Sequence, residues 1–138
     1  MTTTSPTMIP TGPRTLLRLE AALVFLAALA AYAALDGAWG VFLALFLVPD
    51  LSMLGYLAGP RPGAIAYNAA HTYLAGGALA ALGLAVAPSL LPIALIWIAH
   101  VGFDRMLGYG LKAATGFGHT HLGTLAMRGP RFAVYRSA

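Results

Sequence analysis

Ionisable side chains within otherwise apolar stretches are the residues of this sequence that could carry chemistry. All four histidines and three of the four acidic residues lie in or directly after such stretches. An acidic side chain near the centre of a membrane-spanning helix costs roughly 2.5 to 3.5 kcal/mol on insertion scales, so its presence there indicates a function or a partner. The seven residues are Glu20, Asp50, His71, His100, Asp104, His119 and His121.

The spacing of these residues places several side chains on common faces. His100 and Asp104 are four residues apart and therefore share one face of a helix. His119 and His121 alternate, so both project to the same side of an extended loop, and flanking glycines let that loop fold back over the helices. The chain has no cysteine, and any metal must bind nitrogen and oxygen ligands. Zinc and iron accept imidazole and carboxylate ligands, so this polar layer predicts a divalent metal site.

Each of these residues has an expected role and an alternative one. Asp50 is predicted to act as a metal ligand or as a general base, and Glu20 as a second catalytic residue. His100 and Asp104 could instead form an ion pair or a proton relay, and Glu20 could pair with Arg61 or Arg105 near the membrane interface. The predicted metal ligands are His71, His100, Asp104, His121 and, as a further candidate, His119.

The composition of the chain indicates what positions these side chains. Of 138 residues, 59% are hydrophobic and 9% are charged, whereas about a quarter are charged in a soluble globular domain. A water-soluble protein is excluded on this balance, and the mean hydropathy of +0.79 is typical of a multi-pass membrane protein. We predict an all-α fold, a compact four-helix transmembrane bundle within residues 14–123, with spans at about 16–35, 40–57, 64–87 and 90–111.

The two ends of the chain differ from this apolar region. Residues 1–13 are rich in Thr, Ser and Pro without a helical period, and we expect a disordered tail there. Residues 124–138 form a basic tail. Seven Lys and Arg residues fall on the side of the membrane that holds both termini, so the positive-inside rule places both termini in the cytoplasm and the protein in the inner (plasma) membrane. With so few charges, the net charge of +4 indicates topology and membrane lipid as a partner, and no nucleic acid.

A resemblance to a known family rests on several short segments taken together. They are VPDLSMLGY at 48–56, GPR at 59–61, YN at 67–68, HTY at 71–73, AHVGFDR at 99–105, GYGLK at 108–112, TGF at 115–117 and THLG at 120–123. In this combination the chain resembles, over about residues 16–125, the small bacterial integral-membrane family named domain of unknown function 4260. The resemblance implies a multi-pass bacterial membrane protein, and it implies no catalytic role because the family's function is unassigned.

Three classes of function fit these observations. The leading hypothesis is a metal-dependent membrane enzyme that acts on a lipid-soluble substrate from the cytoplasmic leaflet, as a hydrolase with one zinc or as an oxidase with two irons. The second is a small transporter or proton relay, which would need a homo-oligomer because one protomer has too few polar residues in its opposite half. The third is a structural or partner-binding bundle whose polar layer sets the helix register.

Overall fold

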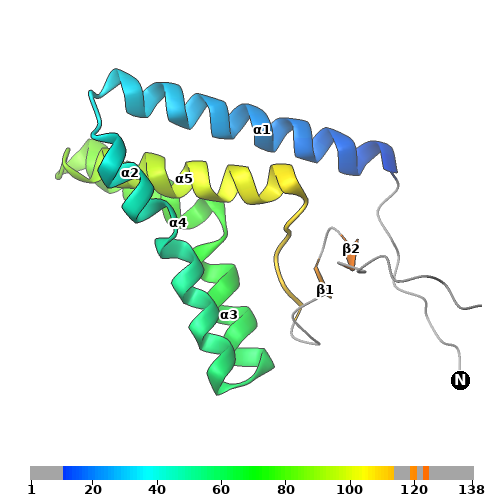
Figure 1. The fold of residues 1–138 in the computed structure, drawn as a ribbon. Coiled ribbons are helices and arrows are strands. Elements are labelled where there is room, and N and C mark those ends of the chain that lie inside the picture. The colour runs from blue at the N-terminus through cyan, green and yellow to red at the C-terminus, as the bar shows by residue number, and fades with distance from the viewer. Residues whose placement is uncertain (1–10, 114–118, 121–122, 125–138) are drawn as a thin grey trace, which may run out of the picture.

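The computed structural model describes residues 11–113, 119–120 and 123–124, and within them the chain is mainly helical (Figure 1). This confirms the all-α class. Two short strands, β1 (His119–Thr120) and β2 (Gly123–Thr124), pair antiparallel after the last helix. The helices, in chain order, are α1 (Thr11–Ala34), α2 (Trp39–Phe46), the 3₁₀ helix η1 (Val48–Ala58), α3 (Pro60–Ala70), α4 (Tyr73–Ala85) and α5 (Leu90–Leu107).

The predicted terminal tails fall mostly outside the described residues. Of the tail expected at 1–13, only residues 11–13 are described, and α1 has already begun there. Of the tail expected at 124–138, only Thr124 is described, at the end of β2. The remaining extent of both tails stays a prediction.

Three stretches of helix are long and apolar enough to cross a membrane by length and composition. They are Gly12–Ala34, Trp39–Ala58 and Leu90–Leu107, and they agree with the first, second and fourth predicted spans. The third predicted span, 64–87, is divided into α3 and the shorter apolar helix α4. A membrane protein is therefore supported, whereas a compact bundle of four helices is not confirmed.

Helices α1 and α5 lie side by side and antiparallel along most of the length of α5 (Figure 1). Gly102 of α5 allows this close approach, because a Cβ atom at this position would lie 3.0 Å from the backbone nitrogen of Phe25 and 3.1 Å from the carbonyl oxygen of Ala21. At one end of the pair, Arg18 Nε donates a hydrogen bond of 2.8 Å to the carbonyl oxygen of Met106. The start of α1 and the end of α5 therefore lie on the same side of the molecule.

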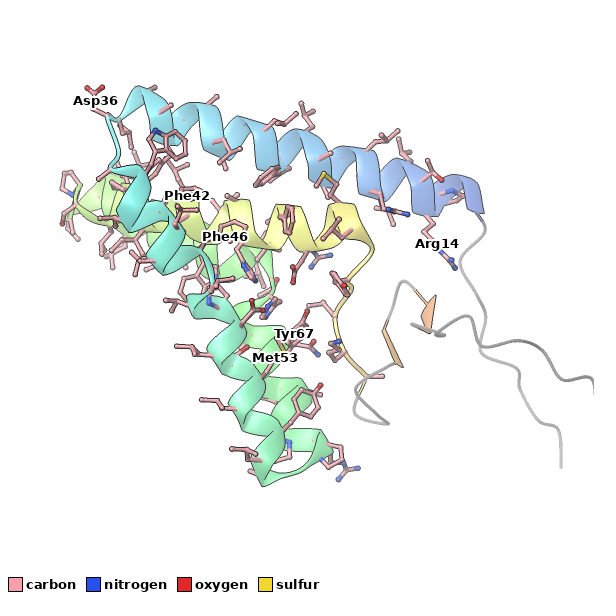
Figure 2. The ribbon with its side chains drawn as sticks, viewed as in Figure 1. Arg14, Asp36, Phe42, Phe46, Met53 and Tyr67 are labelled. Atoms are coloured by element: carbon pink, nitrogen blue, oxygen red, sulfur yellow. The ribbon has the colours of Figure 1, made fainter. Side chains whose placement is uncertain are left out.

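An aromatic core holds α2 against this pair. The Tyr32 ring contacts Trp39 and Phe42, and the Tyr32 hydroxyl donates a hydrogen bond of 2.9 Å to the carbonyl oxygen of Ala38. Phe42 stacks on Phe46 with ring centroids 5.4 Å apart (Figure 2). These contacts fix the path of α2 down to its last residue, directly before the chain bends.

Two helix interruptions determine the shape of the remaining chain. The first separates α2 from η1, at Leu47 and the buried Pro49, whose ring supplies no N–H for continued α-helical bonding. The second separates α3 from α4, at His71 and Thr72, and the Thr72 side chain accepts a hydrogen bond of 3.4 Å from the backbone N–H of Leu74. Between the two interruptions, η1 and α3 pack together as an arm that leaves the α1–α5 pair at a steep angle (Figure 1).

The close approach at Gly102 gives a testable prediction for stability. Gly102→Leu places a side chain against the α1 backbone, which cannot move away without separating the helices, so we expect a loss of about 1 to 3 kcal/mol and a clearly lower thermal midpoint in detergent. Gly77→Leu is the matched control, because a Cβ at Gly77 has no neighbour within 4 Å. Equal midpoints for the two variants would contradict the described α1–α5 packing.

Candidate metal centre

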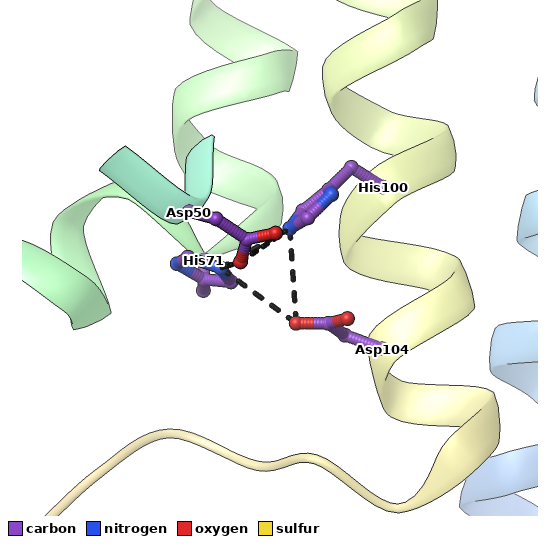
Figure 3. Close-up of side chains that lie close together, drawn as sticks. All are labelled: Asp50, His71, His100 and Asp104. Atoms are coloured by element: carbon purple, nitrogen blue, oxygen red, sulfur yellow. Dashed lines mark hydrogen bonds and ion pairs between the residues drawn. The ribbon is translucent and has the colours of Figure 1, made fainter. Parts of the chain in front are cut away.

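Four of the seven predicted site residues come together in one cluster, from three segments of the chain (Figure 3). Asp50 comes from the first turn of η1, His71 from the interruption between α3 and α4, and His100 and Asp104 from consecutive turns of α5. The two histidines are almost completely buried, with 3% and 2% of their surface exposed, whereas Asp104 and Asp50 are 17% and 33% exposed. Any access to the cluster therefore lies on the side of its carboxylates.

Five distances between the ligand atoms of the cluster are close to the edge length of a tetrahedron of ligands. The Nε2 atoms of His71 and His100 are 3.1 Å apart. Asp50 Oδ1 lies 3.3 Å from His71 Nε2 and 3.6 Å from His100 Nε2, and Asp104 Oδ2 lies 3.6 Å and 3.7 Å from the same two atoms. A tetrahedral metal with bonds of about 2.1 Å has ligand atoms roughly 3.4 Å apart. The four atoms, which all lie within 4.8 Å of one another, could therefore hold one small divalent metal ion.

The protonation of His71 supports a cation between these atoms. His71 Nδ1 lies 3.0 Å from the carbonyl oxygen of Tyr67, and a carbonyl can only accept, so Nδ1 carries the proton. In neutral His71, the Nε2 lone pair then faces two carboxylate oxygens and a second imidazole nitrogen. These groups repel one another unless a proton or a metal ion lies between them. A backbone carbonyl that accepts from Nδ1 is also the usual way to orient a metal-binding imidazole.

The side chains of α5 stabilise the interruption that presents His71. Because α3 ends at Ala70, its last carbonyl groups have no partner within the helix. Trp97 Nε1 donates a hydrogen bond of 2.7 Å to the carbonyl oxygen of Ala70, and Arg105 Nη2 donates one of 3.4 Å to that of His71. Trp97 and Arg105 stand on the same helix as His100 and Asp104, so α5 supplies two of the four cluster side chains and also supports the interruption that holds a third.

Tyr67 connects His71 with Asp104. Its ring stacks on the imidazole of His71, with centroids 3.7 Å apart and an angle of 11° between the planes. Its hydroxyl lies 3.5 Å from Asp104 Oδ2 and donates toward it. Sequence reasoning did not place Tyr67 at the site. The signal was its spacing, because residues 67 and 71 are four apart and share a helix face.

The segment after α5 is hydrogen-bonded to α3 beside the cluster. Asn68 Nδ2 donates a hydrogen bond of 2.8 Å to the carbonyl oxygen of Lys112, and the backbone N–H of Lys112 donates one of 2.7 Å to Asn68 Oδ1. This pairing buries Lys112, whose Nζ lies 5.0 Å from the ring centroid of Tyr67. Burial lowers the pKa of Lys112, while the Asp104 carboxylate opposes the shift by raising it. A cation thus lies near the Asp104 carboxylate of the site.

The other three predicted site residues are not part of this cluster among the described residues. Glu20 is exposed on α1 and is not one of the four clustered residues. Arg105, one of the two alternative partners of Glu20, contacts the backbone of His71 and the ring of Tyr73. His119 lies in β1, its side chain is outside the described part of the structure, and His121 is outside it altogether. The catalytic role of Glu20 and the ligand roles of His119 and His121 stay predictions.

A comparison with protein-family models decides the family of this chain. The model described as Domain of unknown function (DUF4260) matches residues 14–125. The chain belongs to the DUF4260 family. The match includes all four residues of the cluster and confirms the resemblance inferred from the short sequence segments. No curated protein and no solved structure matches this DUF4260 chain.

The support that α5 gives to the interruption can be tested with one substitution in the DUF4260 chain. Trp97→Phe keeps an aromatic ring but leaves the carbonyl oxygen of Ala70 unpaired, so we expect a loss of about 1 to 3 kcal/mol of stability. Because His71 follows Ala70, cobalt affinity should also fall, by roughly tenfold. Trp39→Phe is the control, since Trp39 is exposed and distant from the cluster in sequence. If Trp97→Phe changes neither the thermal midpoint nor cobalt affinity, the hydrogen bond from Trp97 to Ala70 does not stabilise the interruption that presents His71.

Proposed function

We propose that this protein is a metal-dependent membrane enzyme that hydrolyses a lipid-soluble substrate with one divalent metal ion, zinc. His71, His100 and Asp104 are its protein ligands. The observation that carries the proposal is the meeting of two imidazole nitrogens and two carboxylate oxygens from three segments, with the nitrogens 3.1 Å apart and each oxygen 3.3 to 3.7 Å from both nitrogens. Zinc with an open coordination position lowers the pKa of a bound water to about 7 and makes it a nucleophile at neutral pH.

The donor set favours one zinc over two irons. Di-iron sites in helical bundles use about four carboxylates and two histidines. The described cluster offers two carboxylates and two histidines, which suit a single four-coordinate ion. Hydrolysis is therefore the chemistry that this cluster supports best, and oxidation by a pair of irons finds too few ligands among the described residues.

Asp50 is best suited to act as the general base. It is the most exposed member of the cluster, at 33%, and therefore the one that water reaches most readily. A carboxylate at this position can accept a proton from a water that also contacts the metal, provided that the metal keeps three protein ligands. If Asp50 were a fourth permanent ligand, the site would be closed and structural.

A lipid-soluble substrate is supported by the surface next to Asp50. The following turns of η1 expose Leu51 at 62% and Leu54 at 63%. In a chain whose long helices are apolar enough to cross a membrane, these side chains face hydrocarbon, not water. A substrate dissolved in the membrane can therefore approach the carboxylate side of the cluster along η1.

Cobalt, which binds the same ligands as zinc and is coloured, tests the centre and its open position together. We expect about one cobalt per chain in purified protein, with the visible spectrum of a tetrahedral ion. Azide should change this spectrum, because an open position accepts an anion whereas a closed site does not. His100→Ala should weaken cobalt binding by at least about 100-fold, since it removes a ligand.

Asp36→Asn is the matched control for this experiment. Asp36 lies in the turn after α1, at the opposite end of that helix from Arg14 (Figure 2), and its positive φ of 52° is one that asparagine tolerates well. This variant should bind cobalt as the wild type does. A wild-type cobalt spectrum that does not change when azide is added would indicate a structural metal. A well-folded wild type that binds no cobalt would end the proposal in favour of a proton relay or a structural bundle.

We also propose that both ends of the helical region face the cytoplasm. The hydrogen bond from Arg18 to Met106 places the start of α1 and the end of α5 on one side, and the basic residues Arg14, Arg105 and Lys112 belong to the same two chain ends. A cytoplasmically active reporter fused after Ala138 should therefore work, and a periplasmically active one should fail. Reporters inserted near Gly37 or Ala87 should behave in the opposite way. A fusion after Ala138 that is active only in the periplasm would contradict this topology.

A further inference from the structure

Two cations flank the cluster without belonging to it. The guanidinium of Arg105 donates to the carbonyl oxygen of His71 and lies 5.1 Å from the ring centroid of Tyr73. The ammonium of Lys112 lies over Tyr67, the residue that stacks on His71. Both positive groups thus approach the segment that carries His71, one from α5 and the other from the chain that follows it.

The distribution of acidic residues leaves these cations in excess once a metal is bound. The chain has four acidic residues, of which Asp50 and Asp104 belong to the cluster. Glu20 is exposed on α1, and Asp36 is exposed in the turn at the far end of that helix. A divalent ion balances the charges of Asp50 and Asp104. Arg105 and Lys112 then give the loaded centre a surplus of positive charge, which in a membrane of low dielectric constant favours an anion strongly.

The donors of Arg105 are suited to a planar arrangement of anionic oxygens. A guanidinium carries five N–H donors in a rigid fork. The structure shows one weak hydrogen bond from Nη2, of 3.4 Å, and Nε is buried without a hydrogen-bond partner among the described residues. Arginine pairs with phosphate through two parallel hydrogen bonds, and a metal ion, an arginine and a lysine together match the several charged oxygens of a phosphate group better than a single carboxylate.

We infer that the lipid-soluble substrate carries a phosphate group, which binds beside the metal between Arg105 and Lys112. This inference rests on the proposed function, because the surplus of positive charge exists only with the metal in place. It adds the class of substrate, a phosphate ester of a lipid. The acyl chains would lie along the exposed leucines of η1, and the phosphate would lie at the carboxylate side of the cluster.

The test compares two lipids that differ only in the phosphate. Zinc-loaded protein in neutral detergent is titrated with dioleoyl phosphatidic acid and with dioleoylglycerol, and bound lipid is counted by native mass spectrometry together with bound zinc. We expect phosphatidic acid to bind at least about tenfold more tightly. Arg105→Gln and, as a second variant, Lys112→Gln should each reduce this preference severalfold, measured on the zinc-loaded fraction at a zinc concentration that saturates each variant. Arg105→Lys should restore it in part, since it keeps the charge but not the fork.

Arg61→Gln is the matched control, because Arg61 is exposed at the tip of the η1–α3 arm and should not affect the preference. Inorganic phosphate in a competing titration identifies the source of the recognised group. Displacement of the lipid supports recognition of phosphate itself, and no displacement supports recognition of phosphate on a lipid. Stoichiometric zinc with equal binding of both lipids, or a preference that survives both Arg105→Gln and Lys112→Gln, would overturn this inference and leave the metal centre standing. A folded protein that binds no zinc would overturn both this inference and the proposed metal-dependent function.

Discussion

The structure depends on two helix interruptions that face one uninterrupted helix. Pro49 ends the regular course of α2 and places Asp50 in the next turn, and the end of α3 places His71 at its own terminus. A continuous α3–α4 helix would satisfy the carbonyl groups of Ala70 and His71 internally and would turn His71 with its helix face. In the interrupted form, Trp97 and Arg105 of α5 satisfy those carbonyl groups instead. The same contacts therefore hold the bend and position His71 in the candidate metal centre.

Part of this arrangement could be predicted from the sequence, because it depends on local properties. The apolar stretches, the cluster pair at 100 and 104 and the kink at Pro49 follow from hydropathy, helical spacing and the missing N–H of proline. The interruption at His71 could not be predicted from the sequence, since the segment from Tyr67 to Tyr73 contains neither glycine nor proline. It depends on partners 27 and 34 residues away in α5, which no local pattern reveals.

Glu20 shows a second limit of sequence reasoning. Because Arg18 bonds to Met106, Glu20 lies two residues further along α1, at about the level of Asp104 on α5. This level does not specify which face of α1 meets the neighbouring helix. Ala21 is buried against Gly102 of α5, so the adjacent Glu20 projects away from that contact and is exposed. The packing of the small residues Ala21 and Gly102 thus sets the rotation of α1 about its axis, and this rotation leaves Glu20 exposed. Conversely, Lys112 carries an ordinary basic side chain, and only tertiary contacts bring it to the site.

The central claim is that one metal ion binds to His71, His100 and Asp104, with Asp50 beside it, and X-ray absorption spectroscopy of zinc-loaded protein tests it most directly. The account predicts a four-coordinate shell of nitrogen and oxygen at about 2.0 to 2.1 Å, with the outer-shell scattering of two imidazoles. Replacing either His71 or His100 by alanine should reduce the imidazole scattering to that of one ring or remove the bound zinc. A six-coordinate oxygen shell without imidazole scattering in the wild type would contradict the account.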